Sequence, residues 1–266
     1  MVMEQFGTWQ LESLIAVGGL GEVWRATRGE TTAAVKRLHT HLVRNEEARA
    51  LFAQEQQLAV ALPRHPNVVK AIDVGNVDGR PYVALELAAG EDLRRMIAPP
   101  ATPTRATPAA CVLPRVRVVT IVAAACDAAA HLHKYGWVHG DICPSNLIVD
   151  DHDRVVLTDL GVARKAGQAG TVRGTHAYMA PEQVRGEAWS PATDVFALGV
   201  VLWELIADRR LFHRGPPWLS MAAVVEEAVP PLADTVLDAI AQAALVKDPG
   251  QRIASASELA NRLRAL

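Results

Sequence analysis

A proline-rich stretch constrains the fold of this chain more than any other feature of its sequence. It runs from Pro99 to Pro114, with prolines at positions 99, 100, 103, 108 and 114. Proline lacks a backbone N–H and resists both helices and central strands, so this stretch is predicted to be a loop. The hydrophobic pattern is strand-rich before the loop and helical after it. That change predicts two lobes with a cleft between them, in an α+β fold.

Hydrophobic periodicity places the elements within the two parts. Apolar–polar alternation predicts strands, and apolar residues at spacings of three and four predict helices. The predicted strands cover residues 9–17, 22–27, 32–38, 68–74, 82–87, 147–149 and 155–158. The predicted helices cover residues 46–62, 115–135, 194–207, 235–246 and 256–263. Glycines between the first two strands predict that they form a hairpin.

The composition limits the classes of binding partner and the cellular compartment that we expect for this chain. Half of the 266 residues are hydrophobic and the formal net charge is −2, which allows a sizeable core and argues against nucleic acid as a partner. The apolar run 116–130 is interrupted by Thr120 and Asp127, so no membrane span is predicted. Three cysteines without close pairing, and no signal peptide, fit the reducing cytoplasm and exclude a disulfide scaffold.

Two motifs in the first part could bind phosphate. Gly18 and Gly21 would let backbone amides approach an anion, although a hairpin turn alone also explains them. Lys36, in Ala34-Val35-Lys36, needs an anionic partner if it points inward, and a solvated strand lysine is the alternative. A third motif, Leu85-Glu86-Leu87-Ala88, fits an ordinary buried strand when it is taken alone.

Two motifs in the second part carry residues suited to phosphoryl transfer. The run His139-Gly140-Asp141-Ile142-Cys143-Pro144-Ser145-Asn146 has an aspartate that can orient a hydroxyl and an asparagine that offers Mg²⁺ a neutral oxygen. The run Thr158-Asp159-Leu160-Gly161 places a carboxylate at a strand end before a glycine, which suits a Mg²⁺ ligand on a sharply turning loop. His139 is predicted to be a packed scaffold residue and not a catalyst.

A sixth motif, Gly174-Thr175-His176-Ala177-Tyr178-Met179-Ala180-Pro181-Glu182, completes an ordered set. With it the chain resembles the eukaryotic-like (Hanks-type) Ser/Thr protein kinases of bacteria, over about Trp9 to Leu263. The resemblance implies a bilobal protein-kinase-like fold. Residues 1–87 would form a small β-rich N-lobe with one main helix, and residues 88–266 a larger helical C-lobe with a proline-rich insert at 98–114. It also implies ATP and Mg²⁺ as cofactors and proteins with Ser or Thr acceptors as substrates.

The resemblance assigns roles to individual residues. Lys36 would align the ATP phosphates, Asp141 would orient the acceptor hydroxyl, and Asn146 and Asp159 would hold Mg²⁺. The residues expected around ATP are Ala16, Val17, Gly18, Gly21, Val23, Ala34, Lys36, Glu55, Leu85, Glu86, Ala88 and Ile148. Among these, Glu55 would pair with Lys36, and Leu85 would be the gatekeeper of the adenine site.

Further roles implied by the resemblance are structural. Thr175 would bond to the catalytic Asp141, and Glu182 would form an ion pair with Arg252. Asp194 would cap the helix predicted at 194–207 and tie down the loop that carries Asp141.

The sequence departs from the family pattern at several positions. Ala16 replaces the first glycine of the phosphate loop, and Leu160 replaces a phenylalanine. Gly140 replaces the arginine that normally receives the phosphate of a phosphorylated activation loop, so we expect activity that is constitutive or controlled by a regulatory partner protein, without phosphorylation of Thr171. Cys143 replaces a lysine that contacts the γ-phosphate; it is either a reactive thiol or a small space-filling residue.

Two alternatives to a protein kinase stay open on the sequence alone. The loss of the lysine at position 143 is compatible with a pseudokinase, a nucleotide-binding scaffold without transfer. The His-Gly-Asp run is also similar to that of small-molecule phosphotransferases of the aminoglycoside or choline type. The segment from Gly174 to Glu182 argues against this last class. Thr102 and Thr107 in the proline-rich insert are candidate phosphorylation or docking residues, with a spacer as the simpler interpretation.

Overall fold

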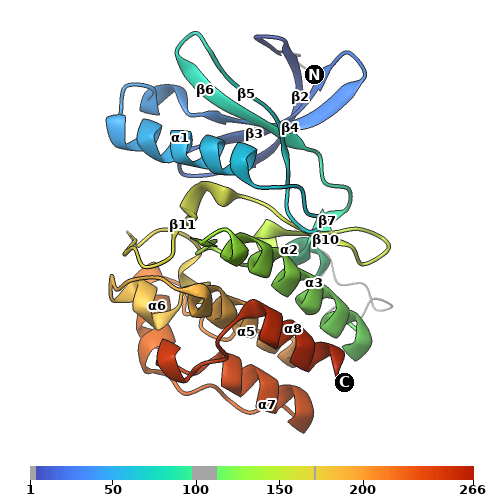
Figure 1. Ribbon diagram of the computed structural model, residues 1–266, viewed down its shortest axis with the longest axis vertical. Helices are drawn as coiled ribbons and strands as arrows, with labels where there is room; N and C mark the ends of the chain where they lie inside the picture. Colours follow the sequence, from blue (N-terminus) through green and yellow to red (C-terminus); the bar gives the residue numbers. More distant parts are fainter. Residues whose placement is uncertain (1–3, 98–112, 171) are drawn as a thin grey trace. The chain divides into compact units, whose positions relative to one another are not determined.

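The computed structural model describes residues 4–97, 113–170 and 172–266. Residues 98–112 of the proline-rich insert, which include Thr102 and Thr107, and Thr171 lie outside the described residues. The chain divides into two compact units, Met1–Ala88 and Ala89–Leu266. The fold is α+β, with the strands concentrated in unit 1 and the helices in unit 2 (Figure 1).

Unit 1 is built on a six-stranded antiparallel sheet. The strand order is β1-β2-β3-β4-β6-β5. The bounds are β1 Glu4–Phe6, β2 Trp9–Val17, β3 Gly21–Arg28, β4 Thr31–Leu38, β5 Ala71–Val77 and β6 Arg80–Glu86. Alternation fixes which side chains face the core, because successive strand residues point to opposite faces. The resulting cluster comprises Phe6, Trp9, Leu11, Ala26, Ala33, Val35, Tyr82 and Ala84.

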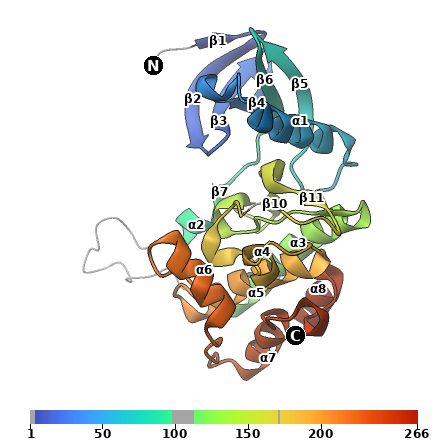
Figure 2. The ribbon, with the colours of Figure 1, turned by 90° about the vertical axis from the view of Figure 1, so that its left-hand side faces the viewer.

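One long helix, α1 (Glu46–Ala61), covers part of this sheet (Figure 2). Asn45 caps it by accepting a hydrogen bond from the Ala48 amide at 2.8 Å. The helix packs on β5 and β6, and Gln56 Nε2 donates to the Tyr82 carbonyl at 2.7 Å. This packing fixes the register of the helix and therefore the position of Glu55 relative to the sheet.

Unit 2 combines short strands with a helical core. The helices are α2 Leu93–Met96, α3 Arg115–Lys134, α4 Pro181–Val184, α5 Pro191–Ala207, α6 Pro217–Glu226, α7 Thr235–Ala244 and α8 Ala256–Arg264. A three-stranded sheet has the order β10-β9-β7, and β11 pairs with β8. The strands are β7 Glu91–Asp92, β8 Trp137–Val138, β9 Leu147–Val149, β10 Val155–Leu157 and β11 Arg164–Lys165.

Helices α3, α5 and α8 pack on one another at the centre of unit 2 (Figure 1). Within the described part of the chain, α3 is the one helix long and apolar enough to cross a membrane by length and composition. Half of its apolar window is buried inside unit 2, including Val118, Ile121, Val122 and Leu132, while Val116 is exposed. The core helix of a globular unit passes the same test, so α3 gives only weak support for a membrane span.

Several predicted boundaries were wrong. The strand predicted at 68–74 is β5 at Ala71–Val77. Val68 instead forms an isolated bridge with His65, across the turn at residues 66 and 67, and Val68 and Val69 are both buried before β5 begins. Helix α5 begins three residues earlier than predicted, so Asp194 is not its N-cap. Ser190 precedes the helix, and its amide donates to Thr193 Oγ1 at 3.1 Å. Helix α6 was not predicted.

Candidate active site

Lys36 of β4 is the central charge of the candidate half-site in unit 1. Its Nζ lies 2.6 Å and 2.9 Å from the two carboxylate oxygens of Glu55 on α1. Lys36 is 8% exposed and Glu55 is 3% exposed, so each buried charge has its counter-charge within hydrogen-bond distance. The ion pair that the resemblance implies is therefore present, and it ties β4 to α1.

The glycine-rich turn joins β2 to β3 beside β4. Gly18 N donates to Gly21 O at 2.8 Å, and the His39 ring contacts Gly18 O at 2.8 Å. A Cβ on Gly21 would lie 2.3 Å from the Arg37 carbonyl oxygen, so close strand packing also requires this glycine. Ala16 and Val17 are exposed at the end of β2.

The sheet brings the other expected nucleotide residues of unit 1 into register. Val23 of β3 is opposite Lys36, and Ala34 of β4 is opposite Leu85 of β6. Leu85 is buried, while Glu86 at the end of β6 is partly exposed and its amide donates to the Lys70 carbonyl at 2.8 Å. Ala88 is the last residue of unit 1.

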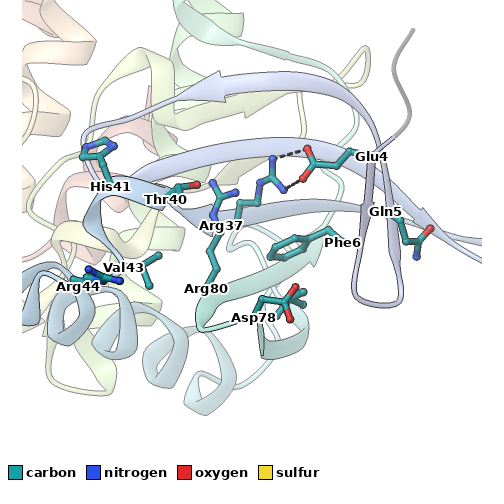
Figure 3. A pocket seen from close by; sticks show the side chains of 11 residues that line it. Glu4, Gln5, Phe6, Arg37, Thr40, His41, Val43, Arg44, Asp78 and Arg80 are labelled. Atoms are coloured by element: carbon teal, nitrogen blue, oxygen red, sulfur yellow. Dashed lines mark hydrogen bonds and ion pairs between the residues drawn. The ribbon is translucent and has the colours of Figure 1, made fainter.

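A cavity of about 560 Å³ opens elsewhere on unit 1 (Figure 3). Arg37 lines this cavity, and its guanidinium donates hydrogen bonds to Glu4 of β1 and to Glu22 of β3. Since Lys36 and Arg37 are consecutive strand residues, their side chains leave β4 on opposite faces. The cavity shares none of its lining residues with the expected ATP-binding residues.

The loop between β8 and β9 carries the candidate catalytic residues of unit 2. Its beginning is held by Asp194 of α5, whose two oxygens accept hydrogen bonds from the His139 and Gly140 amides, each at 2.8 Å. Asp194 also contacts His133 Nε2 at 2.7 Å. The predicted task of Asp194, tying down this loop, is therefore confirmed, although it is performed from inside the helix. His139 is fully buried, as expected of a scaffold residue.

Asp141 lies at the centre of a hydrogen-bonded group. Its Oδ1 accepts from the Thr175 amide at 2.7 Å, so the expected contact with Thr175 runs through the main chain. Asn146 Nδ2 donates to the Asp141 carbonyl at 2.8 Å and to Oδ2 at 3.2 Å. Burial raises the pKa of Asp141, and the nearby Asp159 charge adds to the effect. These contacts hold the carboxylate in place, and its raised pKa makes it a better proton acceptor.

Asp159 follows β10 with a left-handed backbone, φ +60°. Its Oδ1 accepts from the Gly161 amide at 3.3 Å. Because Asn146 Nδ2 is engaged with Asp141, the amide oxygen of Asn146 is the atom that can face a cation. In the described residues no cluster of three or more His, Cys, Asp or Glu could hold a metal. Asp159 offers carboxylate oxygens and Asn146 an amide oxygen, a donor set of the kind that Mg²⁺ takes, with phosphate and water oxygens completing its shell. Ile148, expected beside the nucleotide, is the middle residue of β9.

Cys143 is packed inside the loop. It is 1% exposed, and the Thr175 hydroxyl donates to its sulfur at 3.5 Å. Burial raises the pKa of this thiol to about 12, with the Asp141 charge acting in the same direction. A protonated, enclosed thiol is unreactive, which favours the space-filling interpretation.

The segment after Thr175 is anchored by a buried ion pair. Arg252 Nη1 donates to Glu182 Oε1 at 2.8 Å, and Nη2 donates to Oε2 at 3.1 Å. Arg252 also donates to the carbonyls of Ala192 and Val246, so it joins α4, α5 and the chain before α8. The pair expected from the sequence is present and structural.

Sequence reasoning missed two residues that hold the loop between β8 and β9. Gln183 Nε2 donates to the Gly140 carbonyl at 2.9 Å. The Trp189 ring lies against Gly140, where an added Cβ would be 2.2 Å from a ring carbon. Neither residue belongs to one of the six motifs, so no sequence signal pointed to them.

Comparison with known proteins identifies the class that this architecture defines. The model of the protein kinase domain family matches residues 9–261. The chain therefore belongs to the protein kinase domain family, as the ordered motifs predicted.

Three proteins that are similar to this chain come from bacteria. A probable serine/threonine-protein kinase from Corynebacterium efficiens, CE0033, is 32% identical over 284 residues, covering 97% of this chain and 41% of the relative. Serine/threonine-protein kinase PknB of Mycolicibacterium smegmatis is 32% identical over 272 residues, covering 94% of this chain and 41% of the relative. PknD of Mycobacterium tuberculosis is 32% identical over 275 residues, covering 97% and 40%. The chain spans about two fifths of the length of these relatives.

Proposed function

We propose that this chain transfers the γ-phosphate of ATP to Ser or Thr hydroxyls of proteins. The observation that carries the proposal is the arrangement of Asp141, with Thr175 on one carboxylate oxygen and Asn146 on the other. An aspartate held in this way beside a pair of cation ligands suits in-line attack by a hydroxyl.

The two units contribute different residues to the mechanism. In unit 1, Lys36, held by Glu55, would align phosphate oxygens, and the turn from Gly18 to Gly21 would offer backbone amides. In unit 2, Asp141 would orient the acceptor hydroxyl and take its proton. Asn146 and Asp159 would hold Mg²⁺, which neutralises charge on the transferring phosphoryl group when it is bound.

The anchored segment from Gly174 to Glu182 favours a protein substrate over a small molecule. Arg252 fixes Glu182, and the Thr175 amide reaches Asp141, so the segment links a substrate platform to the catalytic aspartate. The free, buried thiols of Cys126 and Cys143 support a reducing compartment such as the cytoplasm.

Cys143 supports a second candidate function, a nucleotide-binding scaffold. A hydrogen bond to a charged group contributes about 1.5–3 kcal/mol, so loss of the usual lysine lowers the rate about 10–150-fold. Asp141, Asn146 and Asp159 are all retained, which favours a slow kinase over an inactive scaffold.

The first test incubates the protein with Mg²⁺ and γ-labelled ATP and measures label on the protein and on a general protein substrate. We expect labelling by the wild type, and labelling about 10²–10⁴-fold slower by Asp141→Asn, which keeps the shape of the side chain. Lys36→Met and Asp159→Ala should abolish labelling. Label on serine and threonine, and not tyrosine, would support the proposed specificity.

Other outcomes separate the alternatives. Nucleotide binding without labelling would favour the scaffold, and labelling of an aminoglycoside or a small alcohol alone would favour a small-molecule kinase. Binding can be followed independently, because a nucleotide that binds only the native state raises the melting temperature. Mg²⁺ with ATP should raise it more than ATP alone, since the cation relieves the repulsion between Asp141 and Asp159.

A further inference from the structure

Trp189 packs against two glycines that belong to functionally different segments. It is 1% exposed and lies just before α5. A Cβ added to Gly140 would lie 2.2 Å from Cζ3 of its ring, and a Cβ added to Gly170 would lie 2.2 Å from Cζ2. The indole therefore fills the space that side chains at positions 140 and 170 would need.

The backbone of Trp189 holds the same segment that its ring covers. Gly167 N donates to the Trp189 carbonyl at 2.8 Å, and Trp189 N donates to the Gln168 carbonyl at 3.0 Å. Ala169 and Ala188 form a bridge next to these bonds. The guanidinium of Arg164 lies 5.7 Å from the ring centroid of Trp189. We call the chain between Asp159 and Glu182 the activation segment. Its part from Arg164 to Gly170 is held by the main chain and by the ring of Trp189.

On its other side, Trp189 constrains the residue that precedes Asp141. Gly140 has a left-handed backbone, φ +75°, that L side chains rarely adopt. Its amide donates to Asp194, and its carbonyl accepts from Gln183. The ring closes the remaining side, over the Gly140 Cα, so the peptide that leads into Asp141 is held by groups from three other segments.

We propose that Trp189 is a positioning residue that joins the activation segment to the catalytic loop by packing, so that phosphate transfer needs no phosphate on the segment. The proposal rests on the proposed function, with Asp141 as the catalytic residue. A phosphorylated loop is held by an arginine through charge. At position 140 an arginine would collide with Trp189, and the indole makes a contact with the segment that depends on no modification.

The test compares Trp189→Ala with Trp189→Phe and with Trp203→Ala. Trp203 is a matched control, because it is fully buried in unit 2, its Nε1 donates to the Pro230 carbonyl at 2.8 Å, and it is not among the nearest neighbours of Gly140 or Gly170. Assays are run below the melting temperature of every variant. A misplacement of about 1 Å costs about 100-fold in rate, so Trp189→Ala should lower kcat about that much with the KM for ATP unchanged. Trp189→Phe should recover most of the rate, and Trp203→Ala should lower the melting temperature while keeping kcat.

Phosphatase treatment and hydrogen exchange complete the test. Phosphatase-treated wild type should keep its kcat within about twofold. In Trp189→Ala, but not in Trp203→Ala, the amides of Gly167 and Thr175 should exchange at least about tenfold faster, because their partners are no longer held in place. The proposal is overturned by normal kcat in Trp189→Ala, by an equal loss in Trp203→Ala, or by loss of activity after phosphatase treatment. If the wild type transfers no phosphate, the proposed function fails and the exchange rates alone decide whether Trp189 joins the two segments.

Discussion

Asp141 lies on the loop between β8 and β9, and Asp194 of α5 binds the beginning of the same loop. Their surroundings nevertheless shift the pKa values of the two carboxyl groups in opposite directions. Burial raises the pKa of Asp141. Burial also acts to raise the pKa of Asp194, but the hydrogen bond and charge of His133, the charge of His139 and the Gly140 amide hold it below its ordinary value.

The difference follows from what each carboxylate is bonded to. Asp194 is fully buried and its ionised form is stabilised by donors on both oxygens, so it acts as a fixed anchor. Asp141 keeps a charge that the protein stabilises less well, beside a second carboxylate. Divergent pKa values at two carboxylates are typical of different roles in a site. The comparison supports the proposal that Asp141 takes part in the reaction while Asp194 supports its loop.

The largest expected effect comes from removing the anchor. Asp194→Ala should lower the free energy of unfolding by about 3–5 kcal/mol, because two buried amides and His133 lose their acceptor. Asp127→Ala is a matched control, since Asp127 pairs with Arg264 at the surface and should cost less than about 1 kcal/mol. Denaturant unfolding measures both. Equal, small losses would show that Asp194 anchors nothing.

Removing the charge of Asp141 should have the opposite effect on stability. Asp141→Asn should lower kcat about 10²–10⁴-fold, because the base that receives the proton is lost. The same change should raise the free energy of unfolding at pH 7, since it deletes a charge that burial disfavours. Steady-state kinetics and denaturant unfolding check the two statements. A destabilised Asp141→Asn would contradict the comparison.

The pH dependence of stability should separate the two residues further. Above the unfolded pKa of about 3.9, native Asp141 keeps its proton longer than the unfolded chain does, so the free energy of unfolding falls as pH rises to its native pKa. The advantage of Asp141→Asn over wild type should therefore grow from pH 4 upward. Asp194 behaves in reverse: its contribution is present above pH 4 and is lost as pH falls through its lowered native pKa. Unfolding of wild type and both variants between pH 2 and 7 measures these trends.

The smallest expected effect is on the reactivity of the Cys143 thiol and on its contribution to stability. With a pKa of about 12, Cys143 should resist alkylation by iodoacetamide at pH 8 in the native protein and react after unfolding. Its contribution to stability should decline between pH 9 and 12, where the unfolded thiol ionises and the native thiol does not. Peptide mapping of the alkylated protein locates the label. Rapid labelling of native Cys143 would mean that water enters this loop, which would weaken the argument for a raised pKa at Asp141.

Local patterns predicted much of the fold, because residues on the buried face of a strand or a helix recur at a fixed spacing in the sequence. The alternation in residues 9–17 and the helical spacing in residues 46–62 correspond to β2 and α1 within one residue. Boundaries failed where a turn or a cap decided them. Val68 and Val69 are buried beside an isolated bridge to His65 and not within β5, and Pro191 starts α5 before the residue that was expected to cap it.

The sequence by itself determined the order of the motifs and, through them, the family. The family resemblance then predicted the two ion pairs, Lys36 with Glu55 and Glu182 with Arg252. Charge alone predicts only that a buried lysine needs an anionic partner, and does not say which residue it is. The tertiary structure alone decided which contacts surround Asp141 and what occupies the place of the missing arginine. Trp189 lies 49 residues after Gly140 in a segment without a recognisable pattern. Packing depends on distance in space and leaves no periodicity in the chain, so only the folded molecule brings the indole to the two glycines.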